Sequence, residues 1–281
     1  MYKRQGMYSP TGEMVFNSNQ VATLRILLAS LALLPFGYTA VKRIRIKKDI
    51  FYFLIVSICG NMLPAFLFTF AETGISSGFA GMLNSTTPIF TIFIGFGFFK
   101  IKMTWTQIIG SVIGSIGVVF LLYFGKAVSL QGDWKHIIAV VLATLCYATS
   151  LSIIRYKLSH YKSIDIAAIA FIILLIPSII IFLSERTWIV FETNQLAWNN
   201  FMAISILGLI GTAFALFLFN NIIKNTSALF ASSVTYFIPI VAVIIGFFFG
   251  EQLSAYQILS MFIVLLGVFI ANFLGIKNSR H

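Results

Sequence analysis

The stretch SSGFAGMLNSTTPIFTIFIGFGFFK, residues 76–100, is apolar enough to cross a membrane but carries a polar cluster beside a central proline, Pro88. A similar stretch, SALFASSVTYFIPIVAVIIGFFFGE, covers residues 227–251 and has Pro239 at the corresponding place. Proline lacks a backbone N–H and clashes with the preceding helical turn, so each stretch predicts a broken helix. The chain therefore contains the same unusual helix twice.

The similarity extends beyond the two prolines. Aligned without gaps at an offset of 151 residues, segments 60–106 and 211–257 are identical at 13 of 47 positions. The identities include the tripeptide FLF at 66–68 and at 217–219. Self-similarity at a fixed spacing indicates an internal duplication.

Composition gives the class of protein. Hydrophobic residues make up 59% of the 281 residues and charged residues only 10%, whereas soluble domains carry about 25% charged residues. The apolar runs are about as long as the 20 residues that a membrane helix needs. They are apolar on every face, which argues against the alternating pattern of barrel strands. We predict an all-α, polytopic membrane protein.

The apolar runs predict nine membrane spans joined by short connections. The longest connection, at 184–200, contains Trp188 and Trp198, which are typical of interfacial anchors. The nine spans are expected at 20–41, 50–70, 76–99, 105–124, 136–154, 165–183, 200–223, 227–249 and 253–274.

The basic residues predict the orientation of the spans. The net charge is +11, and 13 of the 19 lysines and arginines fall on the side that the chain reaches after its first span. Cytoplasmic loops carry such an excess, so the C-terminus is expected in the cytoplasm. This placement beside spans also argues against a nucleic-acid partner. Lys3 and Arg4 are the exception, because they would lie outside.

Moving from the span that contains Pro88 to the span that contains Pro239 advances five spans, and five is odd, so the second copy is expected upside down. Inverted repeats are a transporter architecture with the substrate site between the repeats. We expect one repeat at 1–125 and a second, inverted repeat at 136–275. The second repeat holds five spans and the first only four, so a further span upstream of residue 20 would complete ten spans. It would also place Lys3 and Arg4 inside.

With these features, the sequence resembles EamA-type transporters of the drug/metabolite transporter superfamily. The resemblance rests on VATLRILLASLALLPF at 21–36, SSGFAGMLNSTTPIFT at 76–91, GSVIGSIGVVFLL at 110–122, GLIGTAFALFLF at 208–219, the stretch 227–258 and LLGVFIANF at 265–273. It implies ten helices in two inverted repeats around a substrate cavity, in a bacterial inner membrane. The family pattern often places Glu after the fourth helix of each half; Glu251 fits, whereas Lys100 departs from it.

Polar residues inside spans are candidates for substrate binding, because such residues tend to face the bundle interior. Asn84 lies one turn before Pro88, where the proline frees a backbone carbonyl, and Thr235 lies likewise before Pro239. The alternative is a packing kink in which Ser and Thr hydroxyls satisfy the backbone. The candidate substrate-binding residues are Arg25, Asn61, Asn84, Thr87, Tyr147, Thr235 and Tyr236.

Several of these candidates have a structural alternative. Arg25 either binds a substrate carboxylate, extends to the headgroups, or pairs with Glu72. Asn61 either contacts substrate or forms a bond between helices. Tyr147 and Tyr236 either line a cavity or simply pack.

Other polar and small residues favour structural roles. Asn220 and Asn221 lie near a cytoplasmic span end, which favours an interfacial position. Gly110, Gly114 and Gly117 permit close helix approach, either inside the chain or in a homodimer. The Glu251 carboxylate either stabilises the N-terminus of the next helix through the helix dipole, or couples transport to protons.

The sequence thus predicts a secondary transporter, an exporter of small organic metabolites such as amino acids, working by alternating access. It contains no Walker motif, and we expect no cofactor, metal site or catalytic residues, because the spans lack paired carboxylates and histidine clusters. The alternative is a membrane scaffold or assembly protein without transport activity. The expected partners are a small-molecule substrate and the lipid bilayer.

Overall fold

A computed structural model describes residues 15–43, 46–75, 77–124, 133–248 and 254–274. Within these ranges, seven helices are long and apolar enough to cross a membrane, and two further apolar helices, Trp105–Leu121 and Ala228–Val241, are shorter. Together they correspond to the nine predicted spans. The protein is therefore a polytopic helical membrane protein, as predicted.

The first half of the chain forms four spans, several of which are built from more than one helical segment. Its elements are α1 (Ser18–Arg43), α2 (Ile46–Ser57), η2 (Ile58–Met62), α3 (Leu63–Gly74), α4 (Ser77–Asn84), α5 (Thr87–Phe99) and α6 (Trp105–Phe124).

The second half begins at α7 and forms five spans. Its elements are α7 (Trp134–Tyr156), α8 (Ser163–Ser184), α9 (Thr187–Thr193), α10 (Ala197–Gly208), η3 (Leu209–Phe214), α11 (Ala215–Asn225), α12 (Ala228–Ser233), η4 (Val234–Tyr236), α13 (Phe237–Phe248), α14 (Ala255–Phe269) and η5 (Ile270–Leu274).

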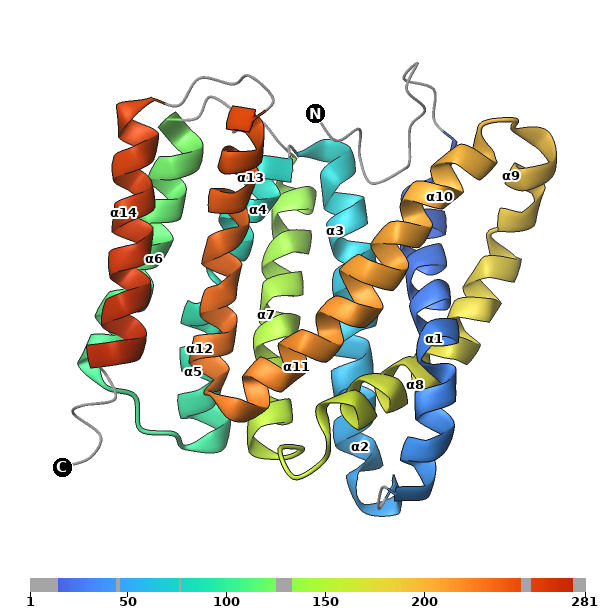
Figure 1. Ribbon diagram of the computed structural model, residues 1–281, viewed down its shortest axis with the longest axis horizontal. Coiled ribbons are helices and arrows are strands. Elements are labelled where there is room, and N and C mark those ends of the chain that lie inside the picture. Colours follow the sequence, from blue (N-terminus) through green and yellow to red (C-terminus); the bar gives the residue numbers. More distant parts are fainter. Residues whose placement is uncertain (1–14, 44–45, 76, 125–132, 249–253, 275–281) are drawn as a thin grey trace.

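The two proline-bearing spans run in opposite directions. The beginning of the first, α4, packs against the end of the second, α13, and α5 packs against α12. Helices at corresponding places in the two halves also pack together, namely α1 with α8 and α6 with α14 (Figure 1). This antiparallel arrangement is what an inverted duplication requires.

Both proline-bearing spans break just before the proline, as the sequence predicts. The first span is interrupted at Ser85 and Thr86, whose hydroxyls donate to the carbonyls of Met82 and Leu83, each at 2.6 Å. The second narrows to the 3₁₀ segment η4, where the Thr235 hydroxyl donates to a carbonyl 2.8 Å away. These hydroxyls add to the backbone bonds at the break, since the Met82 and Leu83 carbonyls also accept the Ser85 and Thr86 N–H groups at 3.1 Å.

A second pair of irregular segments was not predicted. The π-helical segments η2 and η3 lie at corresponding places in the duplication, since Gly60 aligns with Gly211. The Asn61 carboxamide donates to the carbonyl of the residue five positions earlier at 3.2 Å, and the Thr212 hydroxyl does the same at 3.0 Å. Such π segments are rare and frequently mark functional sites.

The glycine motif of α6 packs against α14 within the chain. A methyl group on Gly117 would lie 2.7 Å from the Val264 nitrogen, and one on Gly267 would lie 2.6 Å from the Gly114 Cα. The two backbones therefore approach as closely as small residues permit. These glycines have the internal packing role that was one of the two alternatives.

The connection at 184–200 differs from the predicted loop, because it contains the short helix α9. Trp188 lies in α9 and Trp198 lies at the start of α10, and their side chains are 38% and 59% exposed. Their exposure at a helix end fits the interfacial position expected for tryptophan. Glu251 lies outside the described residues.

Candidate functional site

A cavity of about 580 Å³ lies between the two halves of the chain. From the first half it is lined by residues of α1, η2, α3, α4 and α5, and from the second by residues of α7, α8, η3, α11, η4 and α13. Small-molecule sites commonly measure about 300–1,000 Å³. The broken spans and the π segments thus all contribute to one space.

The structure brings six of the seven candidate residues to this cavity. They come from five different spans and are Arg25, Asn61, Asn84, Thr87, Tyr147 and Thr235. Asn84 and Thr87 lie on either side of the break before Pro88, and the Thr87 hydroxyl donates to the Asn84 carbonyl at 2.6 Å. The proline break therefore does two things at once: hydroxyls satisfy its backbone, and polar side chains face the cavity.

Tyr236 is the exception, because it is not among the residues that line the cavity. Its side chain is fully buried and its ring packs against Gly114 of α6. The hydroxyl donates to the Ser111 carbonyl at 2.8 Å and lies 3.1 Å from the Ser115 hydroxyl. Since α6 satisfies this hydroxyl, the position of Tyr236 corresponds to the packing alternative.

Arg25 is the charged residue among those that line the cavity. It interacts electrostatically with Glu72 of α3 and with Tyr147 of α7. The pairing with Glu72 was one of the predicted alternatives. A guanidinium held in this way presents a fixed positive charge to the cavity, where low dielectric strengthens its attraction for an anion.

Aromatic and aliphatic side chains make up most of the remaining wall. Phe68 and Tyr147 stack with ring centroids 6.0 Å apart, and Phe171 and Phe219 also line the cavity. An apolar wall with a few convergent polar groups is the usual composition of a small-molecule site.

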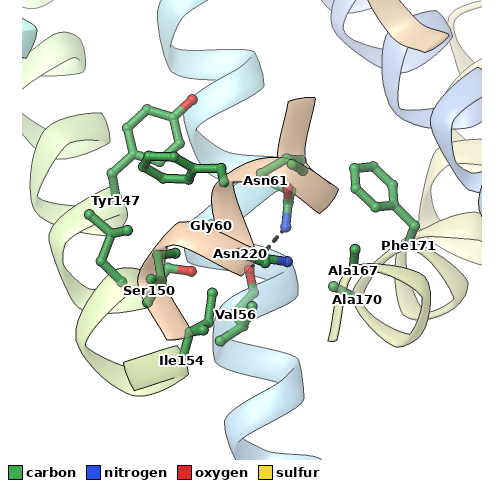
Figure 2. A pocket seen from close by; sticks show the side chains of 14 residues that line it. Val56, Gly60, Asn61, Tyr147, Ser150, Ile154, Ala167, Ala170, Phe171 and Asn220 are labelled. Carbon is green, nitrogen blue, oxygen red and sulfur yellow. Dashed lines mark hydrogen bonds between the residues drawn. The ribbon is translucent and has the colours of Figure 1, made fainter. Parts of the chain in front are cut away.

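Asn220 lies deeper in the bundle than the interfacial position expected for it. The side chain is only 4% exposed and lines a small pocket beside the cavity (Figure 2). It seemed interfacial because the span was expected to end at residue 223, whereas α11 continues to Asn225 and is covered by α7 and α8. The signal in the sequence is a pair of adjacent asparagines, Asn220 and Asn221, near the end of a span. The pair does not indicate which of the two side chains faces inward.

Comparison with known proteins gives this architecture a family. The sequence model of the EamA-like transporter family matches residues 6–123 and 134–273. The chain is 30% identical over 138 residues to the "Uncharacterized transporter YdfC" of Bacillus subtilis, covering 49% of this chain and 43% of YdfC. It is 27% identical to the "Uncharacterized inner membrane transporter YedA" of Escherichia coli K12, covering 69% of this chain and 61% of YedA. These matches thus span less than two thirds of either relative.

The fold also resembles that of a solved crystal structure. It superposes with a TM-score of 0.68 over 94% of this chain and 90% of that chain, at 14% sequence identity. At this identity the likeness concerns the fold alone. The two family matches cover nearly the whole chain, and the chain therefore belongs to the EamA-like transporter family, a family of membrane transporters.

Proposed function

We propose that the chain is a secondary transporter that exports small organic metabolites such as amino acids by alternating access through the 580 Å³ cavity. The observation that carries this proposal is the lining of the cavity. Polar groups from both halves of an inverted duplication converge on it, and substrate sites of inverted-repeat transporters lie at such an interface.

The chemistry of the cavity supports an amino acid or a related carboxylate. The Arg25 guanidinium can bind a carboxylate through charge-assisted hydrogen bonds, which are stronger than neutral ones. The Asn84 carboxamide offers an acceptor for an ammonium group, and the aromatic wall offers apolar contact.

The irregular segments support movement of the two halves. Each half has one break before proline, and the π segments η2 and η3 lie at corresponding places in the two halves. Segments of this kind are frequent at functional hinges. Because the halves are inverted copies, the movement that closes one end of the cavity has a counterpart that closes the other end.

Polar contacts hold together the end of the bundle that we assign to the cytoplasm. The Tyr161 hydroxyl donates to the Asp49 carboxylate at 2.6 Å and ties the α7–α8 connection to α2. The Arg155 guanidinium donates to the Lys224 carbonyl, which joins the ends of α7 and α11. Opening toward the cytoplasm would separate these elements.

Counterflow in proteoliposomes tests the proposal without assuming a driving force. Vesicles containing the purified chain are loaded with an unlabelled amino acid mixture, and uptake of each labelled amino acid is followed. We expect transient accumulation of at least one of them. Vesicles that accumulate no solute above protein-free controls would favour the scaffold alternative. Export is then tested in cells supplied with dipeptides, where expression should lower the internal amino acid pool.

The membrane orientation gives a prediction of its own. The ends of α1, α5, α7 and α11 lie at one edge of the bundle (Figure 1) and carry or adjoin Lys42, Lys100, Arg155 and Lys224. By the positive-inside rule this edge is cytoplasmic. A fluorescent reporter fused to the C-terminus should therefore fluoresce in the cytoplasm, while alkaline phosphatase at the same site stays inactive. The reverse pattern would contradict the orientation.

Asn84→Leu tests the cavity side of the proline break. Leucine has a similar shape but makes no hydrogen bond to a solute, and losing one good bond corresponds to about a tenfold loss of transport. We expect counterflow to fall at least about tenfold while the protein remains monodisperse. Asn225→Leu is the matched control, because Asn225 is exposed and outside the cavity. Equal counterflow in both variants would assign Asn84 to packing.

A further inference from the structure

Figure 2 shows the residues that line a second pocket, of about 50 Å³. This pocket lies directly against the large cavity. The two share part of their walls, including Gly60, Asn61, Tyr147 and Phe219. The small pocket extends from this shared wall between α2, α7, α8 and α11. It has room for a few non-hydrogen atoms but not for an aromatic ring.

Two deeply buried polar side chains line the small pocket without a hydrogen-bond partner among the described residues. Asn220 and Ser150 are each only 4% exposed. Neighbouring residues behave differently. The Ser152 and Thr149 hydroxyls of the same helix donate to its backbone at 2.9 Å, and the Asn225 carboxamide donates to the Asn221 carboxamide at 2.9 Å. Asn220 and Ser150 thus keep their polar groups available to the pocket.

Two further features shape this pocket. The Asn61 side-chain oxygen, at the shared wall, is buried and accepts no hydrogen bond, because the carboxamide is held by its donation to the Val56 carbonyl. Gly60 leaves room for the Ser150 side chain, since a methyl group on Gly60 would lie 3.1 Å from the Ser150 Cβ and closer still to its hydroxyl. The Asn220 carboxamide, the Ser150 hydroxyl and the Asn61 side chain therefore border one small space.

Unpaired polar groups at this depth are unfavourable unless water or a ligand satisfies them. Their combined chemistry, with donors and acceptors but no charge, suits a neutral group that can both donate and accept. A hydroxyl or a carboxamide is such a group, and either fits the volume. Apolar neighbours such as Val56 and Ile154 leave little to compensate a charged group there.

We propose that this pocket is a specificity subsite that binds a hydroxyl or carboxamide at the end of the substrate side chain. The substrate class is then a small amino acid with such a group, whose carboxylate lies in the large cavity. This inference rests on the proposed transport function and refines it. A substrate without the group leaves Asn220 and Ser150 unpaired, and sites of that kind reject apolar analogues strongly.

Counterflow of two pairs of solutes of similar shape tests the subsite. The pairs are threonine against valine and asparagine against leucine, each measured with the full chain in proteoliposomes. The wild-type protein should prefer the polar member of each pair by about tenfold or more, as the loss of one good hydrogen bond implies. Asn220→Leu should bring the ratio close to one, mainly by reducing transport of the polar member.

Two variants accompany this measurement. Asn225→Leu, one turn further along and exposed, should leave the ratio unchanged. Ser150→Ala removes one atom from the pocket and should lower the ratio in the same direction as Asn220→Leu, even if the larger substitution disturbs folding. Asn220→Leu should also raise the thermal midpoint, because it removes an unpaired polar group, whereas loss of a structural hydrogen bond would lower it.

The outcomes separate the two proposals. Transport of all four solutes with ratios that Asn220→Leu and Ser150→Ala leave unchanged overturns the subsite and leaves the transport function standing. Wild-type vesicles that carry none of the four solutes overturn the subsite; if they also carry no other amino acid, the proposed function fails with it.

Discussion

Replacing Arg25 with methionine should reduce amino acid counterflow by about a hundredfold, since a hydrogen bond to a charged group contributes about 1.5–3 kcal/mol and each 1.4 kcal/mol is tenfold. Arg25 is the charged side chain among those that line the cavity. Methionine keeps much of the length and the apolar contact but offers no charge to a carboxylate. The loss should be largest at low solute concentration, because binding is what the substitution weakens.

Arg25 has a second task that the single substitution does not separate from the first. It interacts with the Glu72 carboxylate, so Arg25→Met also leaves a buried acid without its positive neighbour. Removing one partner of a buried pair is strongly destabilising, by about 3–5 kcal/mol. The double variant Arg25→Met with Glu72→Gln removes both charges and restores the local balance.

The double variant distinguishes the two tasks. If Arg25 binds the substrate, the double variant should recover the stability that Arg25→Met loses but remain inactive, while Glu72→Gln alone keeps most of its transport. Recovery of counterflow in the double variant would show that Arg25 serves to neutralise Glu72. Thermal midpoints of the purified variants provide the stability comparison.

Six of the seven residues selected from the sequence line the cavity, because membrane physics restricts where polar residues go; that they bind substrate stays a prediction. Asn84, Thr87 and Thr235 lie in the cavity for the reason used to select them, namely that hydrocarbon penalises polar groups facing lipid. The alignment of Pro88 with Pro239 likewise predicted two broken, antiparallel spans. Both inferences depend on features that are local in the sequence.

Details that depend on neighbouring helices were not predictable in the same way. From the sequence alone Tyr236 is a plausible cavity residue, but in the structure its hydroxyl donates a hydrogen bond to the Ser111 carbonyl of α6. Asn220 looks interfacial until α7 and α8 are seen to cover it. The π segments η2 and η3 carry no distinctive residue of their own, because a shift of backbone pairing is compatible with many side chains.

The glycine contact between α6 and α14 gives the largest expected effect on stability. A methyl group on Gly267 would lie 2.6 Å from the Gly114 Cα and 2.8 Å from the Gly110 carbonyl oxygen. Both are backbone atoms, so the side chains cannot adjust and the two helices must separate. Inserting a single carbon into packing this close costs about 1–3 kcal/mol. Gly267→Ala should therefore lower the thermal midpoint of the detergent-purified protein by several degrees.

Gly97→Ala is the matched control, because no heavy atom lies within 4 Å of a methyl group placed there. In the last turn of helix α5 it should leave the midpoint unchanged or raise it slightly, since alanine favours the helix over glycine by up to about 1 kcal/mol. None of the described side chains of α6 or α14 lines the cavity, so the protein that remains folded in Gly267→Ala should keep the wild-type solute preference. Equal midpoints for the two alanine variants would contradict the close α6–α14 contact, whereas an altered preference would mean that this pair of helices also shapes the substrate site.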